Sequence, residues 1–370
     1  MILRIEDLKE VCSKILSAVD SSELSVLTET LELKTENKIL YLSVTNREYY
    51  VKVKLELEEE VDFHATVNAN LFLKLISQTT TETVEINVVD TTLVVKGNGV
   101  YKLPLIYNDD KLLELPTIDI ENETAKFDIN GDILVSILTY NSKEISKGNI
   151  VRPVQKLYYV DEKGAITFTT GACVNNFTLE KPIKILLNQK VVKLFKLFKD
   201  DSVHFTLGQD KLSEELIQTK VRFENGLVSI TAILPSDNSL IASVPVDAIR
   251  DRASTTYPYS VSVNKDELIQ AINRLLLFTD SKEFIKSFGN FEFYKDHMVL
   301  KDNTGINNEK LYYATPLDNC DYKNAIDLMD LKSTLENCVE KYLTMSFGDG
   351  QAVVIARGNV YNVIPEITEI

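Results

Sequence analysis

Residues 2–19 of the chain, ILRIEDLKEVCSKILSAV, join a short strand-like start to an amphipathic helix, and this unit decides the fold. Leu8, Val11, Cys12 and Ile15 follow the i, i+3, i+4 spacing that gathers apolar side chains on one face of a helix. The same order returns in residues 125–141 (AKFDINGDILVSILTYN) and 259–278 (YSVSVNKDELIQAINRLLLF), at intervals of roughly a third of the chain. The sequence therefore predicts internal repetition.

A second repeated unit of strand, helix and further strands begins near Phe63, Ile183 and Ala325. Runs rich in β-branched and aromatic residues fill the intervals, with Asn, Asp or Gly at their breaks. The chain is thus predicted to be α+β, with six such units in three pairs covering residues 1–120, 121–246 and 247–370. Because each helix accompanies about four strands, the helices are expected to share one face of the sheets.

Composition limits the partners of this protein. The chain has 370 residues, and 40 Lys and Arg against 55 Asp and Glu give a net charge of −15. A protein with this net charge does not bind nucleic acid or an anionic membrane with its whole surface. Any contact with DNA therefore needs a local basic patch. The four cysteines show no C-x-x-C pairing and are expected to be free thiols. With charges near the N-terminus and no long apolar run, the sequence predicts a cytoplasmic protein that does not enter membranes.

The motifs of common enzyme classes are missing from the sequence. It has no Gly-rich nucleotide loop, no G-x-S-x-G and no H-E-x-x-H. His64, His204 and His297 each lie alone in a strand-like segment, which is typical of structural histidines. Carboxylate runs such as Asp109-Asp110 and Glu58-Glu59-Glu60 read as solvated turns. We expect no catalytic residue, no metal and no other cofactor.

Positive charge recurs on the predicted helices. In residues 188–199, Val191, Leu194, Phe195 and Phe198 form an apolar arc with lysines on the opposite side. A lysine-bearing helix face is often only a solvated surface, but its recurrence in an acidic chain favours a weak site for a polyanion. The residues predicted to face DNA are Lys9, Lys14, Lys74, Lys143, Lys147, Lys190, Lys193, Lys196, Arg274 and Lys332.

Three tandem α+β modules, an acidic total and helix-borne lysines resemble the bacterial-type DNA sliding clamp, the beta subunit of DNA polymerase III. Local matches are Thr169–Val174 (TTGACV), where the family has a Thr-Asp-Gly-His-Arg-Leu turn, and Val353–Pro365 (VVIARGNVYNVIP), which resembles its last two strands. The resemblance is to a divergent member, of the kind that a phage or plasmid encodes. It implies three clamp domains that form half of a closed homodimeric ring, with helices lining the hole and sheets outside.

The resemblance also implies partners and sites. A clamp encircles duplex DNA without reading its sequence, is opened by an ATP-driven clamp loader, and tethers the DNA polymerase and other replication or repair proteins through their clamp-binding peptides. Matching positions place Tyr101, Leu277 and Phe278 at the dimer interface. The partner-peptide cleft would include Val154, Thr169, Gly171, Val174, Ile364 and Pro365. The family's His-Arg is Ala172-Cys173 in this chain, and its Phe-Pro-Asp-Tyr linker is replaced by Arg250–Ala253.

Two other functions remain open from the sequence. One is a repeat-type scaffold for protein interactions that never encloses DNA. The other is an α+β hydrolase that uses a dispersed carboxylate pair, which no motif supports.

Overall fold

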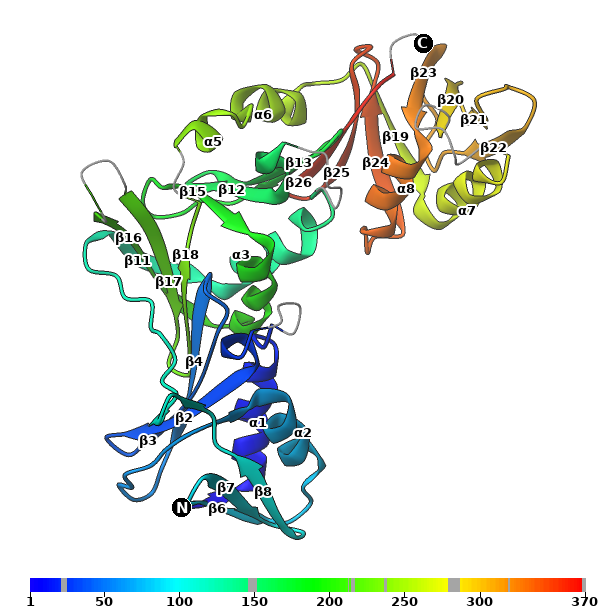
Figure 1. The fold of residues 1–370 in the computed structure, drawn as a ribbon. Coiled ribbons are helices and arrows are strands. Elements are labelled where there is room, and N and C mark those ends of the chain that lie inside the picture. The colour runs from blue at the N-terminus through cyan, green and yellow to red at the C-terminus, as the bar shows by residue number, and fades with distance from the viewer. Residues whose placement is uncertain are drawn as a thin grey trace. The chain divides into compact units, whose positions relative to one another are not determined.

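The computed structural model describes residues 1–20, 25–145, 152–211, 213, 217–235, 238–278, 287–318 and 320–367 (Figure 1). The chain divides into two compact units. Unit 1 comprises Met1–Val135 and Lys190–Ser236, and unit 2 comprises Ser136–Gln189 and Asp237–Ile370.

The first stretch of unit 1 alternates short helices with antiparallel strands. Its elements are β1 (Ile2–Arg4), α1 (Ile5–Leu16), η1 (Leu27–Glu29), β2 (Thr30–Glu36), β3 (Ile39–Thr45), β4 (Tyr49–Glu56), β5 (His64–Asn68), α2 (Ala69–Gln78), β6 (Thr83–Val89), β7 (Thr92–Lys96), β8 (Val100–Pro104), β9 (Tyr107–Asn108), β10 (Lys111–Leu112) and β11 (Glu123–Asn130). The helix α3 (Gly131–Ser136) leads out of the unit. The chain returns through α4 (Gln189–Val192) into the 3₁₀ helix η4 (Lys193–Phe198) and the strands β16 (Ser202–Lys211), β17 (Ile217–Glu224) and β18 (Val228–Ile233).

An eight-stranded antiparallel sheet in the order β11-β16-β17-β18-β4-β3-β2-β5 forms the centre of the described part of unit 1. Side chains alternate between its faces. Phe205, Phe223, Ile230, Val51 and Val44 stand in register as one apolar row across five strands. The helix α1 packs on β3 and β4, and Phe195 of η4 lies 4.9 Å from Phe223, ring centre to ring centre. These helices therefore cover the apolar face, and the opposite face is polar.

Unit 2 is built from η2 (Ile137–Asn141, a π-helical turn), η3 (Pro153–Lys156), β12 (Leu157–Asp161), β13 (Gly164–Phe168), β14 (Ala172–Asn176), β15 (Lys184–Asn188), α5 (Asn238–Ala242), α6 (Val246–Ser254), β19 (Tyr259–Asn264), α7 (Lys265–Leu276), β20 (Phe288–Phe293), β21 (His297–Lys301), β22 (Asn308–Tyr312), β23 (Tyr322–Asp327), α8 (Leu328–Glu336), β24 (Tyr342–Phe347), β25 (Ala352–Arg357) and β26 (Val360–Pro365). Its described strands form an eight-stranded sheet, β15-β12-β13-β14-β26-β25-β24-β19, and a four-stranded sheet, β22-β21-β20-β23.

The large sheet of unit 2 is apolar on both faces. Val353, Ile355 and Ile364 point into a core that also holds residues of α7 and α8. Their neighbours Val354 and Val363 point into a second cluster, which includes Ile249 and Ala253 of α6. The helix α6 and the pair α7 and α8 therefore pack on opposite faces of this sheet.

One local junction, a strand that leads directly into a capped helix, occurs in both units. Each of β5, β19 and β23 ends in a residue whose side chain caps the next helix. The side-chain oxygens of Asn68, Asn264 and Asp327 accept from backbone N–H groups of α2, α7 and α8. A capping oxygen satisfies an N–H group that the helix itself cannot bond, a contribution of about 1 kcal/mol.

The α+β fold predicted from the sequence is confirmed, and so is the shared helix face in unit 1. The single long helix predicted over residues 188–199 is wrong, because α4 ends at Val192 and a 3₁₀ helix continues. The residues 121–246 contribute to both units, since β18 pairs with β4 while β14 pairs with β26. The three-module division stays a prediction.

Candidate partner cleft and basic helix faces

The helix α6 of unit 2 is fixed on the sheet by two arginines. Both terminal nitrogens of Arg250 donate to the Asp161 carboxylate, at 2.8 and 2.6 Å, and Arg252 donates to Asp349 at 2.6 Å. Burial alone would raise the pKa of Asp161, but the Arg250 bonds and the Lys163 N–H outweigh it and lower the pKa. A paired, ionised Asp161 thus holds α6 at one position, with Ile249 and Ala253 turned to the sheet.

A cleft of about 330 Å³ opens between α6 and the sheet. Its walls come from the turn between β13 and β14, from the ends of β25 and β26, and from α6 with the residue before it. The lining residues include Phe168, Gly171, Ala172, Pro245, Ile249 and Val363. A Cβ atom at Gly171 would lie 2.8 Å from the Val363 carbonyl oxygen, so glycine keeps the turn close to β26. An apolar cleft of this size fits one or two side chains of a peptide.

The structure brings three of the six predicted cleft residues to this cleft: Thr169, Gly171 and Pro365. Val154 and Val174 lie in the core beneath it. Ile364 points to the opposite face of the sheet, into the core with α7 and α8. Its strand neighbours Val363 and Pro365 line the cleft instead, because successive residues of a strand face opposite sides.

Sequence reasoning missed the contribution of the segment that carries α6. Pro245, Ala248, Ile249 and Arg252 line the cleft, but residues 246–254 hold only two buried positions, Ile249 and Ala253. The available signal was that spacing, an apolar pair at i and i+4 that turns one helix face to the sheet.

The predicted basic residues of unit 1 lie on helices. Lys193 and Lys196 of η4 and Lys74 of α2 are exposed, and Lys9 of α1 is half-buried. Lys14 pairs with Glu10 at 3.5 Å. Lys190 lies 3.1 Å from Asp20 and 3.6 Å from Glu48, so its charge is already neutralised. Lys193 and Lys196 are therefore better placed than Lys190 to attract an external anion.

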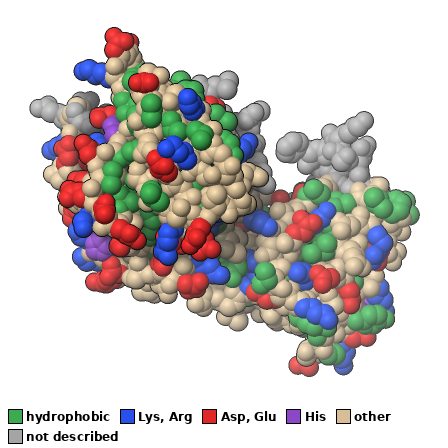
Figure 2. Space-filling view, turned by 90° about the horizontal axis from the view of Figure 1, so that it is seen from below, with side chains coloured by type: hydrophobic (Ala, Val, Ile, Leu, Met, Phe, Trp, Pro, Cys, Tyr) green, Lys and Arg blue, Asp and Glu red, His purple; other side chains and the backbone are tan. Residues whose placement is uncertain are grey.

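The predicted basic residues of unit 2 are mostly engaged. Arg274 of α7 forms two hydrogen bonds to Glu309 of β22, at 2.6 and 3.0 Å. Lys332 pairs with Glu336 along α8 at 3.6 Å, and exposed Lys143 donates to the Asn337 side chain. Lys147 lies outside the described residues. Acidic and basic side chains are interspersed on the face shown in Figure 2.

The residues predicted for a dimer interface are all exposed. Tyr101 is 40% exposed on β8, which forms one edge of the sheet β1-β6-β7-β8. Leu277 and Phe278, 79% and 59% exposed, directly follow α7, which packs against the edge strand β22. None of the three belongs to the core of its unit.

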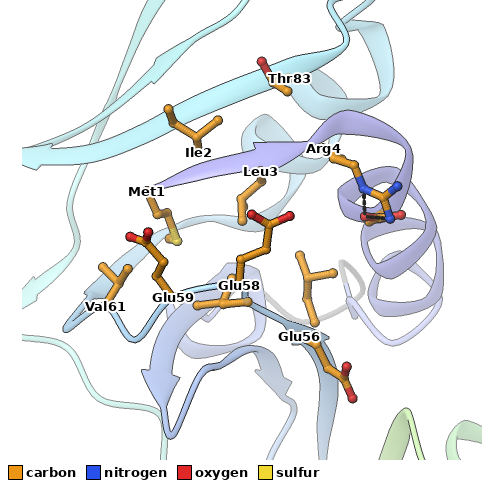
Figure 3. Close-up of a pocket in the computed structure, with 12 residues that line it drawn as sticks. Met1, Ile2, Leu3, Arg4, Glu56, Glu58, Glu59, Val61 and Thr83 are labelled. Atoms are coloured by element: carbon orange, nitrogen blue, oxygen red, sulfur yellow. Dashed lines mark hydrogen bonds and ion pairs between the residues drawn. The ribbon is translucent and has the colours of Figure 1, made fainter.

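The start of unit 1 forms a hollow of about 690 Å³ (Figure 3). Glu58 and Glu59 extend from the loop after β4 toward Leu3 of β1 and toward Met1, which precedes that strand. Arg4, on the rim, pairs with Asp7 at 2.7 Å. Glu58, Glu59 and Glu60 are exposed, as predicted for a solvated turn. The described residues contain no group of three or more His, Cys, Asp or Glu side chains that could hold a metal ion.

The fold is that of the bacterial DNA sliding clamps, and the resemblance predicted from the sequence is confirmed at the level of the fold. A Pseudomonas aeruginosa sliding clamp bound to griselimycin matches 100% of this chain and 99% of its own, with a TM-score of 0.83 at 14% identity. The clamp of Bacillus subtilis matches 100% of this chain and 99% of its own, with a TM-score of 0.78 at 15% identity. A Helicobacter pylori beta clamp bound to a DNA ligase peptide has the same coverage, a TM-score of 0.74 and 15% identity.

Sequence comparison points the same way over a shorter stretch. The beta sliding clamp of Mycoplasmopsis pulmonis is 28% identical over 122 residues, which make up 32% of this chain and 31% of that protein. No protein-family model matches the chain. None of the helices in the described ranges is long and apolar enough to cross a membrane.

Proposed function

We propose that this protein is a DNA replication processivity factor, a sliding clamp that closes as a homodimeric ring around duplex DNA. The observation that carries the proposal is the likeness of the whole chain to sliding clamps. The edge strands support it. β8 in unit 1 and β22 in unit 2 each end a four-stranded sheet, and Val100, Tyr101 and Tyr312 on them are exposed. Exposed apolar edge strands are ready to pair with another chain, and a two-fold ring would join one edge of each kind at both interfaces.

The basic residues suit loose contact with DNA. A sliding ring needs weak attraction to phosphates and no base readout, and lysines act as point charges without the fixed fork of arginine. Lys9, Lys74, Lys193 and Lys196 are such lysines on helices of unit 1, in a protein whose net charge of −15 repels DNA elsewhere.

The cleft beside α6 is the proposed docking site for partner peptides. The Helicobacter pylori clamp bound to a DNA ligase peptide is a structural neighbour, and a cleft lined by Phe168, Ile249 and Val363 would hold the apolar anchors of a short peptide. The partners would be a DNA polymerase, a clamp loader and other replication or repair proteins. The clamp itself would be non-catalytic, act without a cofactor and work in the cytoplasm.

Imaging and retention on DNA test the proposal together. Negative-stain images with light scattering on the same sample should give a hollow ring of about twice the chain's 41.9 kDa. Ring protein loaded on nicked circular DNA should stay bound at a salt concentration that removes it from the same DNA after linearisation. A ring can slide off the free end of linear DNA, but a circle has no end from which it could escape. A solid 41.9 kDa particle with equal loss from both DNA forms would overturn the clamp and favour the interaction scaffold.

A further inference from the structure

A second pocket lies on the polar face of the large sheet of unit 1, opposite the helices. Its volume is about 250 Å³. Its floor is formed by four neighbouring strands, β17, β18, β4 and β3, which Figure 1 shows in the middle of this unit. Residues 117–119, from the segment between β10 and β11, form its rim. This segment is fixed from below, since Lys220 donates to the Asp119 carbonyl at 2.7 Å and Asp210 accepts from the Glu121 and Asn122 N–H groups.

Two of the three cations that line this pocket, Lys52 and Arg222, differ from the other cations on the same face. Outside the pocket, Lys220, Lys126 and Lys34 each lie within 4.0 Å of a carboxylate, and so does Lys54 at the pocket wall. Among the described residues, by contrast, no carboxylate lies within that distance of Lys52 or Arg222. The Lys52 ammonium lies over the Tyr41 ring at 4.4 Å, and Arg222 Nε donates to the Thr231 hydroxyl at 3.4 Å.

The two cations are half-buried in a chain with 55 acidic residues, yet both face the same small cavity. Charges that are partly shielded from water attract an opposite charge more strongly than exposed ones do. The terminal nitrogens of an arginine also match the two oxygens of a carboxylate. This arrangement is suited to an anion that enters from outside.

The other residues that line the pocket indicate which groups the ligand carries beside its negative charge. Ile118 and the rings of Tyr41 and Tyr50 offer apolar surface, and Ser229 and Thr231 offer hydroxyl groups. Burial, together with the charges of Glu32 and Asp119, raises the pKa of Tyr50 although a bond to Ser43 opposes it. The Tyr50 hydroxyl therefore keeps its proton. The carboxylates of Asp119 and Glu224 at the rim would repel a polyanion such as DNA.

We infer that this pocket binds a single carboxylate carried on a short apolar stem, with Lys52 and Arg222 as the residues that recognise it. Such a group is the side chain of glutamate or aspartate in a partner peptide, or a free small carboxylic acid. Like the cleft of unit 2, which lies beside the β14–β26 pair, the pocket lies where strands from distant parts of the chain pair, β18 with β4, but its lining carries charged side chains. The inference stands on the pocket alone and does not depend on the proposed function.

Calorimetric titration of the full chain at low ionic strength tests it with two probes, butyrate and the capped peptide acetyl-Gly-Leu-Glu-Gly-amide. The double variant Lys52→Gln/Arg222→Gln should weaken binding of the effective probe about tenfold or more, since a charge-assisted pair is worth about 1.5 to 3 kcal/mol. The matched control is Lys34→Gln/Lys126→Gln, which removes two charges from the same face outside the pocket and should bind as the parent does.

Each outcome decides the matter. Binding of the peptide alone assigns the pocket to a partner protein, and binding of butyrate, with or without binding of the peptide, assigns it to a free acid. No binding of either probe at millimolar concentration, or equal binding by both double variants, overturns the inference. The variant Ser229→Glu keeps both cations and places a carboxylate of the chain opposite Lys52, across the β18–β4 pair. It should lose the probe as well, and it serves if the double variant does not fold.

Discussion

Among the described residues of unit 2, no lysine or arginine nitrogen lies within 4.0 Å of the Glu144 carboxylate. Its two oxygens accept from the hydroxyls of Thr334, at 3.2 Å, and Thr169, at 3.4 Å, so it links the segment after η2 to α8 and to the β13–β14 turn. Burial and the charge of Asp330 raise its pKa, against the opposing effect of the two hydroxyl bonds and the charge of Arg357. The protonated form of Glu144 is therefore better accommodated by the fold than the ionised form.

We expect Glu144→Gln to stabilise the protein increasingly as pH rises. A pKa that is raised by folding contributes stability below the unfolded value, near 4.5, and this contribution is lost as pH rises through the folded pKa. The neutral amide cannot ionise, so the difference in unfolding free energy between variant and parent should grow from pH 4.5 to pH 8. Urea unfolding across this range measures it, with the exposed Glu58→Gln as control. A difference that does not change with pH would contradict the expectation.

At the scale of the element, η4 shows how backbone geometry sets a charged surface. A 3₁₀ helix has three residues per turn, so Lys193 and Lys196 lie in one line. Leu194, Phe195 and Phe198 are buried against the sheet beneath. In an α-helix the same two lysines would be offset by about 60° around the axis and would be less closely aligned.

The double variant Lys193→Ala/Lys196→Ala should weaken binding to linear duplex DNA while leaving the fold, and the retention of a closed ring on circular DNA, intact. Each phosphate contact contributes about 0.9 to the slope of log affinity against log salt, so the slope should fall by about 2. The affinity for a linear duplex, measured at several NaCl concentrations, gives this slope. Lys34→Ala/Lys126→Ala removes equal charge from the opposite face of the sheet and should leave the slope unchanged. Equal slopes for the two variants would mean that η4 does not face DNA.

The sequence carried most information where a periodic pattern decides the local structure. The order of strand and helix around Asn68, Asn264 and Asp327 was predicted, because apolar residues at a 3.6-residue period after a strand-like run leave a direct pattern. The face of the sheet on which Ile364 lies could not be predicted. In a strand that is apolar on both sides, apolar and polar residues do not alternate. Residues 121–246 are divided between the two units because their strands pair with strands far apart in sequence, and no local sequence pattern encodes such pairing.

At the scale of the whole molecule, the edge strands β8 and β22 each lack a strand partner on one side within the described part of the chain. In β8, Val100 and Tyr101 are 64% and 40% exposed, whereas Leu103 of the same strand is buried. In unit 2, Tyr312 on β22 is 60% exposed and carries Lys310 over its ring at 5.0 Å. An edge of this kind favours aggregation unless a specific partner covers it, and a closed ring covers every such edge.

We therefore expect Val100→Asp/Tyr101→Asp to convert the ring into single chains. Each substitution places an unpaired charge where the second chain would exclude water, and a buried charge without a partner costs several kcal/mol. Light scattering should fall from about twice the chain's mass to 41.9 kDa, and retention on circular DNA should fall to the level on linear DNA. The control Val88→Asp/Val89→Asp changes two exposed valines on β6, a strand between β1 and β7, and should leave the ring closed. If both double variants keep the mass of the dimer, β8 is not an edge through which the ring closes.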